Sequence, residues 1–155
     1  MIKHIKCDIF ESGADIICHQ VNCQGVMGSG IAKQVREKFP NVYKDYKLMC
    51  DDEHIKENLL GSAQFLFTNS SETQMIANLF AQERYGYDGS CYTDYDALRS
   101  CLEKVALVCV GHTVAIPYLM SCHRGGGYWN TVYSMIEDVF ADSDCEVLIC
   151  EYNGG

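Results

Sequence analysis

The sequence lacks an excess of positive charge, a long apolar run and a recognisable metal-binding pattern. Its 12 Lys and Arg residues are outnumbered by 21 Asp and Glu, for a formal net charge of −9. This balance argues against a broad surface for nucleic acid or an anionic membrane. No apolar stretch approaches the roughly 20 residues that a membrane-spanning helix needs. The first residues also lack the apolar core of a secretory signal.

The ten cysteines show no Cys-x-x-Cys spacing, and there is no His-Glu-x-x-His. A zinc site is therefore not expected. Without a secretory signal a disulfide scaffold is not expected either, and Cys18, Cys101, Cys109 and Cys150 sit in apolar runs, where a thiol behaves as a small hydrophobic group. We expect free thiols, a cytoplasmic protein, and neither a metal nor a cofactor.

Apolar residues recur along the chain in alternating strand and helix patterns. The 155 residues fit one domain, 1–155, and no repeat or linker divides them. Periodicity predicts strands at residues 2–7, 15–21, 62–68, 74–80, 113–117 and 146–152. It predicts helices at residues 31–39, 42–49, 93–108 and 129–140, with Thr93 capping the third. The expected fold class is α/β, with helices on both faces of a largely parallel or mixed sheet.

The most informative stretch lies between the second predicted strand and the first predicted helix. This first glycine loop (residues 22–30) contains Gly25, Gly28 and Gly30 and no proline. Glycine lets a ligand approach the backbone without meeting a Cβ, and the first turn of a helix attracts anions. The loop is therefore either a phosphate site or a tight turn whose glycines only relieve crowding. It is not a P-loop, because no Gly-Lys-Ser/Thr follows.

A second glycine loop (residues 118–128) follows the predicted strand at 113–117. In open α/β sheets ligands gather at the carboxyl ends of the strands, where both glycine loops are expected. Two such loops suit a diphosphate better than a single phosphate. The tyrosine-rich segment 81–92 is too long for a simple connection, which suggests a binding lid.

The order and spacing of three motifs resemble the macrodomain, a three-layer α/β/α module with a central mixed sheet that binds ADP-ribose. The motifs are Asp8-Ile9, Asn22 with Gly28-Ser-Gly-Ile-Ala32, and Ile116-Pro117 with Gly125-Gly-Gly-Tyr-Trp129. Together they run over nearly the whole length. The chain looks most similar to the branch that processes ADP-ribose 1″-phosphate, which includes terminal ADP-ribose glycohydrolases.

The resemblance implies a role for each part of the site. Asp8 would accept a hydrogen bond from the adenine amino group beside the Ile9 backbone, or else cap the turn that follows the first strand. Tyr118 would flank the adenine or fill the end of the sheet. Backbone N–H groups of the two loops would clamp the diphosphate, and amide side chains would pair with the distal ribose. The remaining ligand-binding residues that it implies are Gln20, Asn22, Gln24, Met27, Gly28, Ser29, Gly30, Ile31, Gln82, Pro117, Ser121, Cys122, His123, Arg124, Gly125 and Gly126.

The chain departs from the glycohydrolase pattern at two places. That pattern has a Lys after the fourth strand, where this chain reads Phe80-Ala-Gln-Glu-Arg-Tyr85, and an Asp where this chain has Gly125. A ring opening assisted by that Lys is therefore not expected. His19, near the end of the second strand, is expected to be a core histidine.

Two functions within this family remain open; a nucleotide-binding domain of another family would need a different acidic residue near the adenine. The first is a hydrolase that removes a phosphate, acyl or ADP-ribosyl group at the distal ribose. In it Asn22 would orient water or the ribose, and His123 would exchange protons, since an imidazole titrates near neutral pH. The second is a reader that binds ADP-ribose without turnover, with His123 exposed to solvent. The expected partner is ADP-ribose or an ADP-ribosylated substrate, and we expect a monomer.

Overall fold

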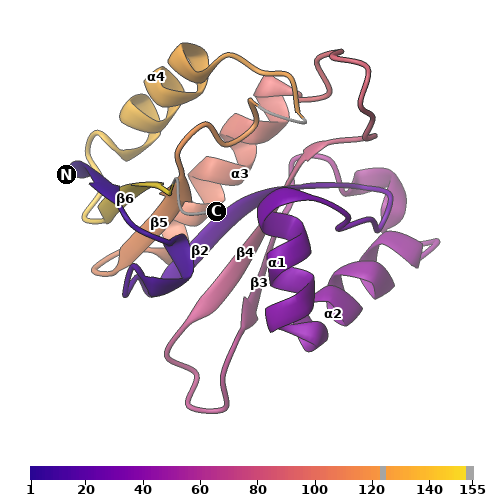
Figure 1. Cartoon of the computed structure of the whole chain (residues 1–155), viewed down its shortest axis with the longest axis horizontal. Helices are drawn as coiled ribbons and strands as arrows, with labels where there is room; N and C mark the ends of the chain where they lie inside the picture. Colours follow the sequence, from indigo (N-terminus) through magenta and orange to yellow (C-terminus); the bar gives the residue numbers. More distant parts are fainter. Residues whose placement is uncertain (123–124, 153–155) are drawn as a thin grey trace.

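The computed structural model, which describes residues 1–122 and 125–152, has a six-stranded sheet between two pairs of helices (Figure 1). The strands are β1 (Ile2–Lys6), β2 (Ile16–Asn22), β3 (Ala63–Phe67), β4 (Met75–Gln82), β5 (Thr113–Pro117) and β6 (Glu146–Glu151). Their order in the sheet is β1-β6-β5-β2-β4-β3. Neighbouring strands are parallel except β3 and β4, which form an antiparallel pair. The expected mixed sheet is confirmed.

Helices cover both faces of this sheet. They are α1 (Gly30–Lys38), α2 (Pro40–Asp51), α3 (Tyr95–Val108) and α4 (Trp129–Phe140), with the short 3₁₀ helices η1 (Ile9–Glu11) and η2 (Lys56–Asn58) in connecting segments. The pair α1 and α2 lies on one face, and the pair α3 and α4 on the other (Figure 1). Among the helices of the described chain, none is long and apolar enough to cross a membrane.

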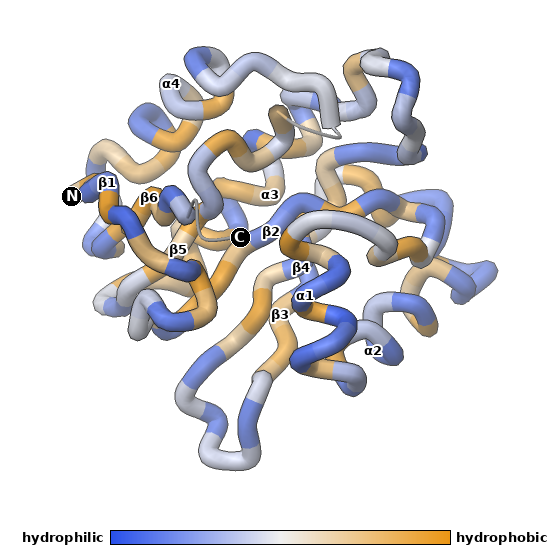
Figure 2. Tube along the Cα trace, viewed as in Figure 1, coloured by the Kyte–Doolittle hydropathy of each residue, from blue (hydrophilic) through white to orange (hydrophobic). Residues whose placement is uncertain are grey.

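Strand β2 shows why the sheet is buried on both faces. Its side chains alternate, so Ile16 and Cys18 pack with the α3 and α4 cluster, while Ile17 and Val21 pack with the α1 and α2 cluster. Figure 2 shows apolar residues along the strands, and polar residues at the turn that joins β3 to β4. Burial on both faces matches the near-continuous apolar run that predicted a strand here.

The N-cap of α3 lies one residue later than predicted. Thr93 is not its N-cap, because the side chain of Asp94 accepts the hydrogen bond from the backbone N–H of Ala97 at 3.0 Å. The Thr93 hydroxyl instead forms hydrogen bonds with residues of other elements, described below. The predicted ends of α4 and of β5 are confirmed.

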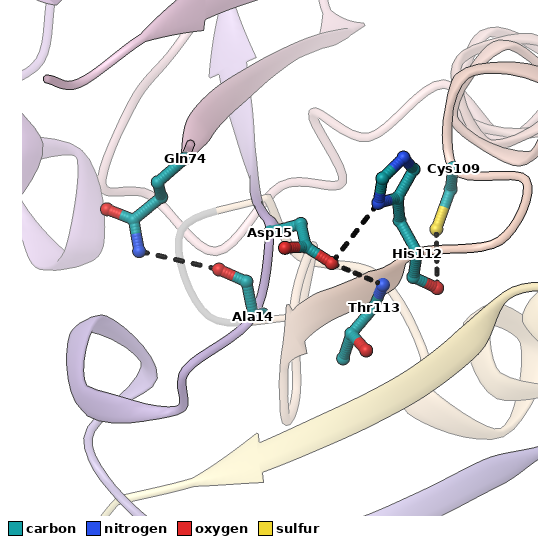
Figure 3. Close-up of polar contacts among 6 residues, drawn as sticks. All are labelled: Ala14, Asp15, Gln74, Cys109, His112 and Thr113. Carbon is teal, nitrogen blue, oxygen red and sulfur yellow. Dashed lines mark hydrogen bonds and ion pairs between the residues drawn. The ribbon is translucent and has the colours of Figure 1, made fainter. Parts of the chain in front are cut away.

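Polar contacts tie the amino ends of three neighbouring strands together (Figure 3). The Asp15 carboxylate accepts a hydrogen bond from the backbone N–H of Thr113 at 2.9 Å and lies 3.5 Å from His112 Nδ1. Gln74 Nε2 donates to the carbonyl of Ala14 at 3.4 Å. Because these contacts join residues at the starts of the strands, β2, β4 and β5 are held together at this end. The cavity described next lies at their opposite, carboxyl ends.

Candidate functional site

A cavity of about 190 Å³ lies at the carboxyl ends of β2, β4 and β5. No Asp, Glu, Lys or Arg is among the described residues that line it. Of the described residues, an anion in this cavity would therefore meet only backbone N–H groups and uncharged side chains. The described residues that line the cavity are His19, Gln20, Val21, Asn22, Val26, Gly28, Ser29, Gly30, Ile31, Ala32, Gln82, Tyr85, Gly86, Tyr87, Pro117, Tyr118, Leu119, Met120, Ser121 and Gly125.

Asn22 organises the first glycine loop. Its Oδ1 accepts hydrogen bonds from the backbone N–H groups of Gln24 at 3.0 Å and Val26 at 3.3 Å, and its Nδ2 donates to the Val26 carbonyl at 2.8 Å. The buried Tyr46 hydroxyl lies 2.9 Å from Asn22 Oδ1 and 2.6 Å from the Asn22 carbonyl. Burial raises the pKa of Tyr46, so its hydroxyl stays a donor. Asn22 therefore holds the loop, and one N–H of its amide remains for a ligand.

The first turn of α1 is open to the cavity. Ser29 occupies the N-cap position but makes no side-chain cap hydrogen bond, so the N-cap side chain does not satisfy the first N–H groups of the helix. A Cβ placed on Gly28 would meet Val26 Cγ1 at 3.7 Å, which is an ordinary van der Waals contact. The packing of the protein therefore does not require glycine at position 28. The space beside Gly28 belongs to the cavity.

The second glycine loop is packed against the protein instead. The Gly125 carbonyl accepts hydrogen bonds from the backbone N–H groups of Tyr92 at 2.7 Å and Thr93 at 2.9 Å. A Cβ on Gly125 would lie 2.6 Å from the Ser121 carbonyl oxygen. A Cβ on Gly126, whose φ is +69°, would lie 2.9 Å from the Cα of Cys91. Internal packing therefore explains both glycines, and a contact of their N–H groups with a ligand stays a prediction.

A network of hydrogen bonds among uncharged side chains holds the second glycine loop in place. Gln20 Nε2 donates to Gln82 Oε1 at 2.8 Å and to Thr93 Oγ1 at 2.9 Å. Gln20 Oε1 accepts from the Ser121 hydroxyl, and the Thr93 hydroxyl donates to the Ser121 carbonyl at 3.0 Å. Gln82 Nε2 donates to the Arg84 carbonyl at 2.8 Å. Because both N–H groups of the Gln20 amide are used internally, Gln20 positions its neighbours rather than offering a donor to the cavity.

The structure brings many of the predicted residues together and separates others. Those that line the cavity are Gln20, Asn22, Gly28, Ser29, Gly30, Ile31, Gln82, Pro117, Tyr118, Ser121 and Gly125. Those that do not line it are Asp8, Ile9, Gln24, Met27, Cys122 and Gly126. His123 and Arg124, the first of them a predicted catalytic residue, lie outside the described residues.

The predicted residues beyond the cavity have structural contacts of their own. Asp8 caps η1 through a 3.0 Å hydrogen bond from the Phe10 N–H, which is the turn cap considered from the sequence. Ile9 and Met27 are buried in the core on the α1 and α2 side. Gln24 donates to the Glu83 carbonyl at 3.1 Å. For Ile9 and Met27 a ligand contact would have to involve the backbone, and the ligand roles of all four stay predictions.

Several lining residues were not among the predicted site residues. Tyr85 and Tyr87 come from the tyrosine-rich segment and are 45% and 64% exposed. Their placement at the cavity agrees with the binding lid suggested by that segment. His19 also lines the cavity, although the sequence pattern indicated only a core residue. Within residues 1–122 and 125–152, no group of three His, Cys, Asp or Glu side chains could hold a metal ion.

This chain is similar to known proteins in its sequence and in its fold. The family model described as Macro domain matches residues 18–136. An ADP-ribose 1″-phosphate phosphatase of Scheffersomyces stipitis is 34% identical over 84 residues, which cover 50% of this chain and 49% of that protein. The match thus spans about half the length of this relative.

Solved structures share the fold over nearly the whole chain. A Bacteroides thetaiotaomicron protein of unknown function is 27% identical, with a TM-score of 0.82 and 97% and 98% of the two chains covered. The DarTG protein of Thermosipho africanus, solved in complex with ADP-ribose, is 20% identical with a TM-score of 0.77. The similarity to DarTG covers 97% of this chain and 41% of that protein, and it concerns the fold alone.

Proposed function

Since this chain belongs to the macro domain family, we propose that its cavity binds ADP-ribose and that the chain hydrolyses a linkage at the distal ribose. The observation that carries the proposal is the open space at Gly28 beside the uncapped start of α1. The Scheffersomyces relative, named as an ADP-ribose 1″-phosphate phosphatase, supports this class of substrate. The Thermosipho structure, solved with ADP-ribose, is evidence that a protein with this fold can hold this ligand.

In the proposed complex the diphosphate lies against the start of α1. The first-turn N–H groups of a helix and its dipole favour a negative charge. Gly28 has no Cβ that would hold a phosphate away from the backbone, and the cavity presents no carboxylate among its described lining residues. A chain with a net charge of −9 can in this way hold one small anion without a basic patch.

The two ends of the cavity suit the two ends of ADP-ribose. Tyr118, which follows β5, lies on the side of the sheet that leads to Asp8 and is proposed to flank the adenine. Asn22 and Gln82, at the ends of β2 and β4, are proposed to face the distal ribose. Each of these two amides keeps one N–H that no described hydrogen bond uses.

The proposed reaction is the attack of water on a group carried by the distal ribose. With a 1″-phosphate, the water oxygen bonds to phosphorus, the bond from phosphorus to the ribosyl oxygen breaks, and a proton moves from the water to the leaving oxygen. The products are ADP-ribose and inorganic phosphate. His123 is proposed to carry the proton, and the free N–H of Asn22 to orient the ribose, which agrees with a lining that lacks carboxylates among the described residues.

A binding measurement tests the first half of this proposal. We expect the wild type to bind ADP-ribose in the micromolar range in a calorimetric titration, about −8 kcal/mol. Gly28→Val should abolish measurable binding, because the new side chain fills the space beside the start of α1, while thermal unfolding stays unchanged. Ser70→Val, in the exposed turn between β3 and β4, is the matched control and should bind normally. Normal binding by Gly28→Val would refute the placement of the ligand.

A turnover measurement tests the second half. Incubation of the wild type with ADP-ribose 1″-phosphate should release inorganic phosphate, and the same assay on an ADP-ribosylated protein should show whether an ADP-ribosyl linkage is also cleaved. Binding of ADP-ribose without release from either substrate would show that the chain is a reader.

A further inference from the structure

Two rings from other elements contact the ring of Tyr118, the residue that follows β5 at the cavity. The centroids of the Tyr118 and His4 rings are 5.0 Å apart, and their planes are inclined by 53°. The ring of Trp129, at the start of α4, meets Tyr118 in an edge-to-face arrangement, with centroids 5.3 Å apart and planes at 82°. Such tilted and edge-to-face pairs are favourable for aromatic rings. The orientation of the Tyr118 ring is therefore restrained by residues of β1 and α4.

The register of the sheet brings His4 to Tyr118 across β6. His4 on β1 and Ile116 on β5 both have Ile149 as their Cα partner in β6. Tyr118 lies two residues beyond Ile116, and its backbone N–H continues the ladder by donating to the Cys150 carbonyl at 2.8 Å. Because side chains two residues apart on a strand share a face, Tyr118 and His4 lie on the same face of the sheet. The contact between the two rings thus follows from the order of the strands.

Glu151 holds the imidazole of His4. It lies two residues beyond Ile149, on the same face of β6, and its Oε1 is 2.9 Å from His4 Nε2. An ionised carboxylate can only accept a hydrogen bond, so Nε2 is the donor in this contact. The side chain of His4 is 47% exposed. Replacement of His4 should therefore leave the core intact.

Tyr118 is half-buried and lines the cavity. Its hydroxyl forms no hydrogen bond with the described residues, and it is not one of the buried polar atoms that lack a partner there. The hydroxyl is therefore open to solvent. Tyr118 thus combines a ring that the protein restrains with a polar end that a ligand can reach.

We propose that His4, held by Glu151, is a positioning residue that fixes the Tyr118 ring for contact with the adenine of ADP-ribose. This proposal rests on the function proposed above, in which Tyr118 flanks the adenine. A side chain that is already restrained loses less conformational freedom when a ligand binds, so the restraint increases affinity. His4 is not among the described residues that line the cavity, and it acts through Tyr118. Its effect should therefore be shared by ligands that carry the adenine.

Calorimetric titrations with ADP-ribose and with ADP, which carries the adenine but lacks the distal ribose, test this assignment. His4→Ala should weaken the binding of both ligands by the same factor, about fivefold. His4→Phe keeps an aromatic ring and should restore both affinities to within about twofold of the wild type. Lys3→Ala removes the neighbouring ion pair of β1, with Glu146 at 3.0 Å, and is the matched control with wild-type affinity. Unchanged affinity for either ligand in His4→Ala would overturn the proposal.

A double-mutant cycle separates the positioning of Tyr118 from a general effect of His4 on the fold. Tyr118→Ala should weaken ADP-ribose binding about tenfold. Adding His4→Ala to this variant should lower the affinity further by less than about 1.5-fold, because no ring is left to position. Thermal unfolding checks that each variant is folded, and the comparison of His4→Ala with His4→Phe does not depend on the folding of Tyr118→Ala.

Two results of the cycle would overturn the proposal while leaving the proposed function intact. The first is a loss from His4→Ala that is as large without the Tyr118 ring as with it. The second is wild-type ADP-ribose affinity in Tyr118→Ala. A folded wild type that does not bind ADP-ribose at all would instead refute the proposed function, and this inference with it.

Discussion

The two glycine loops look alike in the sequence but differ in what occupies the space beside them. In the first glycine loop, a Cβ on Gly28 would find only an ordinary contact with Val26. In the second, a Cβ on Gly125 would collide with the Ser121 carbonyl and with Gln20 Nε2. The space beside the first loop is therefore available to a ligand, whereas the space beside the second is filled by the chain itself.

The polar side chains next to the two loops also differ, in whether they have hydrogen-bond partners. Below the second loop, Gln20, Thr93 and Ser121 satisfy one another through hydrogen bonds. At the cavity, which the first loop also lines, His19 Nδ1 has no hydrogen-bond partner among the described residues. Glycine patterns in strand-to-helix loops can thus reflect either a ligand or internal packing, and the surroundings of each Cβ position separate the two.

Substitution of Gly125 should have the largest effect on stability. Gly125→Val would force apart the Ser121 carbonyl and the Gln20 amide, and we expect the free energy of unfolding to fall by at least about 3 kcal/mol. Urea denaturation followed by far-ultraviolet circular dichroism measures this. Gly28→Val is the matched variant in the other loop and should leave stability nearly unchanged. Equal stability of the two variants would contradict the comparison.

Lowering the pH should reduce the free energy of unfolding because His19 is buried. Burial lowers the pKa of His19 to about 4, below the value of about 6.5 in an unfolded chain. Between these two pH values the ring is protonated in the unfolded state and neutral in the folded state. The stability due to the neutral ring is thus complete above pH 6.5 and declines as the pH falls to about 4, by about 2–3 kcal/mol.

His19→Gln should lack this decline, which denaturation at a series of pH values would reveal as a difference from the wild type. The exposed His54→Gln is its control and should keep the wild-type pH dependence. If His19→Gln followed the wild-type curve between pH 6.5 and 4, the ring would not be held neutral by burial.

A smaller loss is expected from the network below the second loop. Thr93→Val removes the hydroxyl that accepts from Gln20 and donates to Ser121, so two buried groups lose a partner and stability should fall by about 1–2 kcal/mol. Thr131→Val, at an exposed position of α4, is the control with the same change of side chain and should be nearly neutral. Thermal unfolding of both variants measures the difference, and similar values would show that the network contributes little.

The smallest effect on stability is expected at the loop that we propose binds the ligand. Gly28→Ala should change the free energy of unfolding by less than about 0.5 kcal/mol, because its Cβ would meet only Val26 Cγ1, at an ordinary 3.7 Å. ADP-ribose affinity should nevertheless fall measurably in a titration. A variant that lost stability but not affinity would reverse the assignment of the two loops.

Sequence patterns predicted most of the elements because their signals are local. The 3.6-residue repeat through Val132, Met135 and Ile136 predicted α4 with its observed ends, and the apolar run after Asp15 predicted β2 to within one residue. Thr93 shows where such signals fail. The neighbouring Asp94 is the N-cap of α3. The Thr93 hydroxyl instead forms hydrogen bonds with Gln20 and Ser121, which are 73 and 28 residues away in the chain.

By itself the sequence determined the alternation of strands and helices and the position of both glycine loops at strand ends, since periodicity and glycine placement act over a few residues. The strand order, the partners of Gln20 and the partner of His19 were decided by the tertiary structure. The partner of His19 Nε2 is Asn78 Oδ1 on β4, 59 residues away in the chain. The space beside Gly28 and the crowding at Gly125 likewise depend on segments that meet only when the sheet forms, because no short stretch of sequence specifies them.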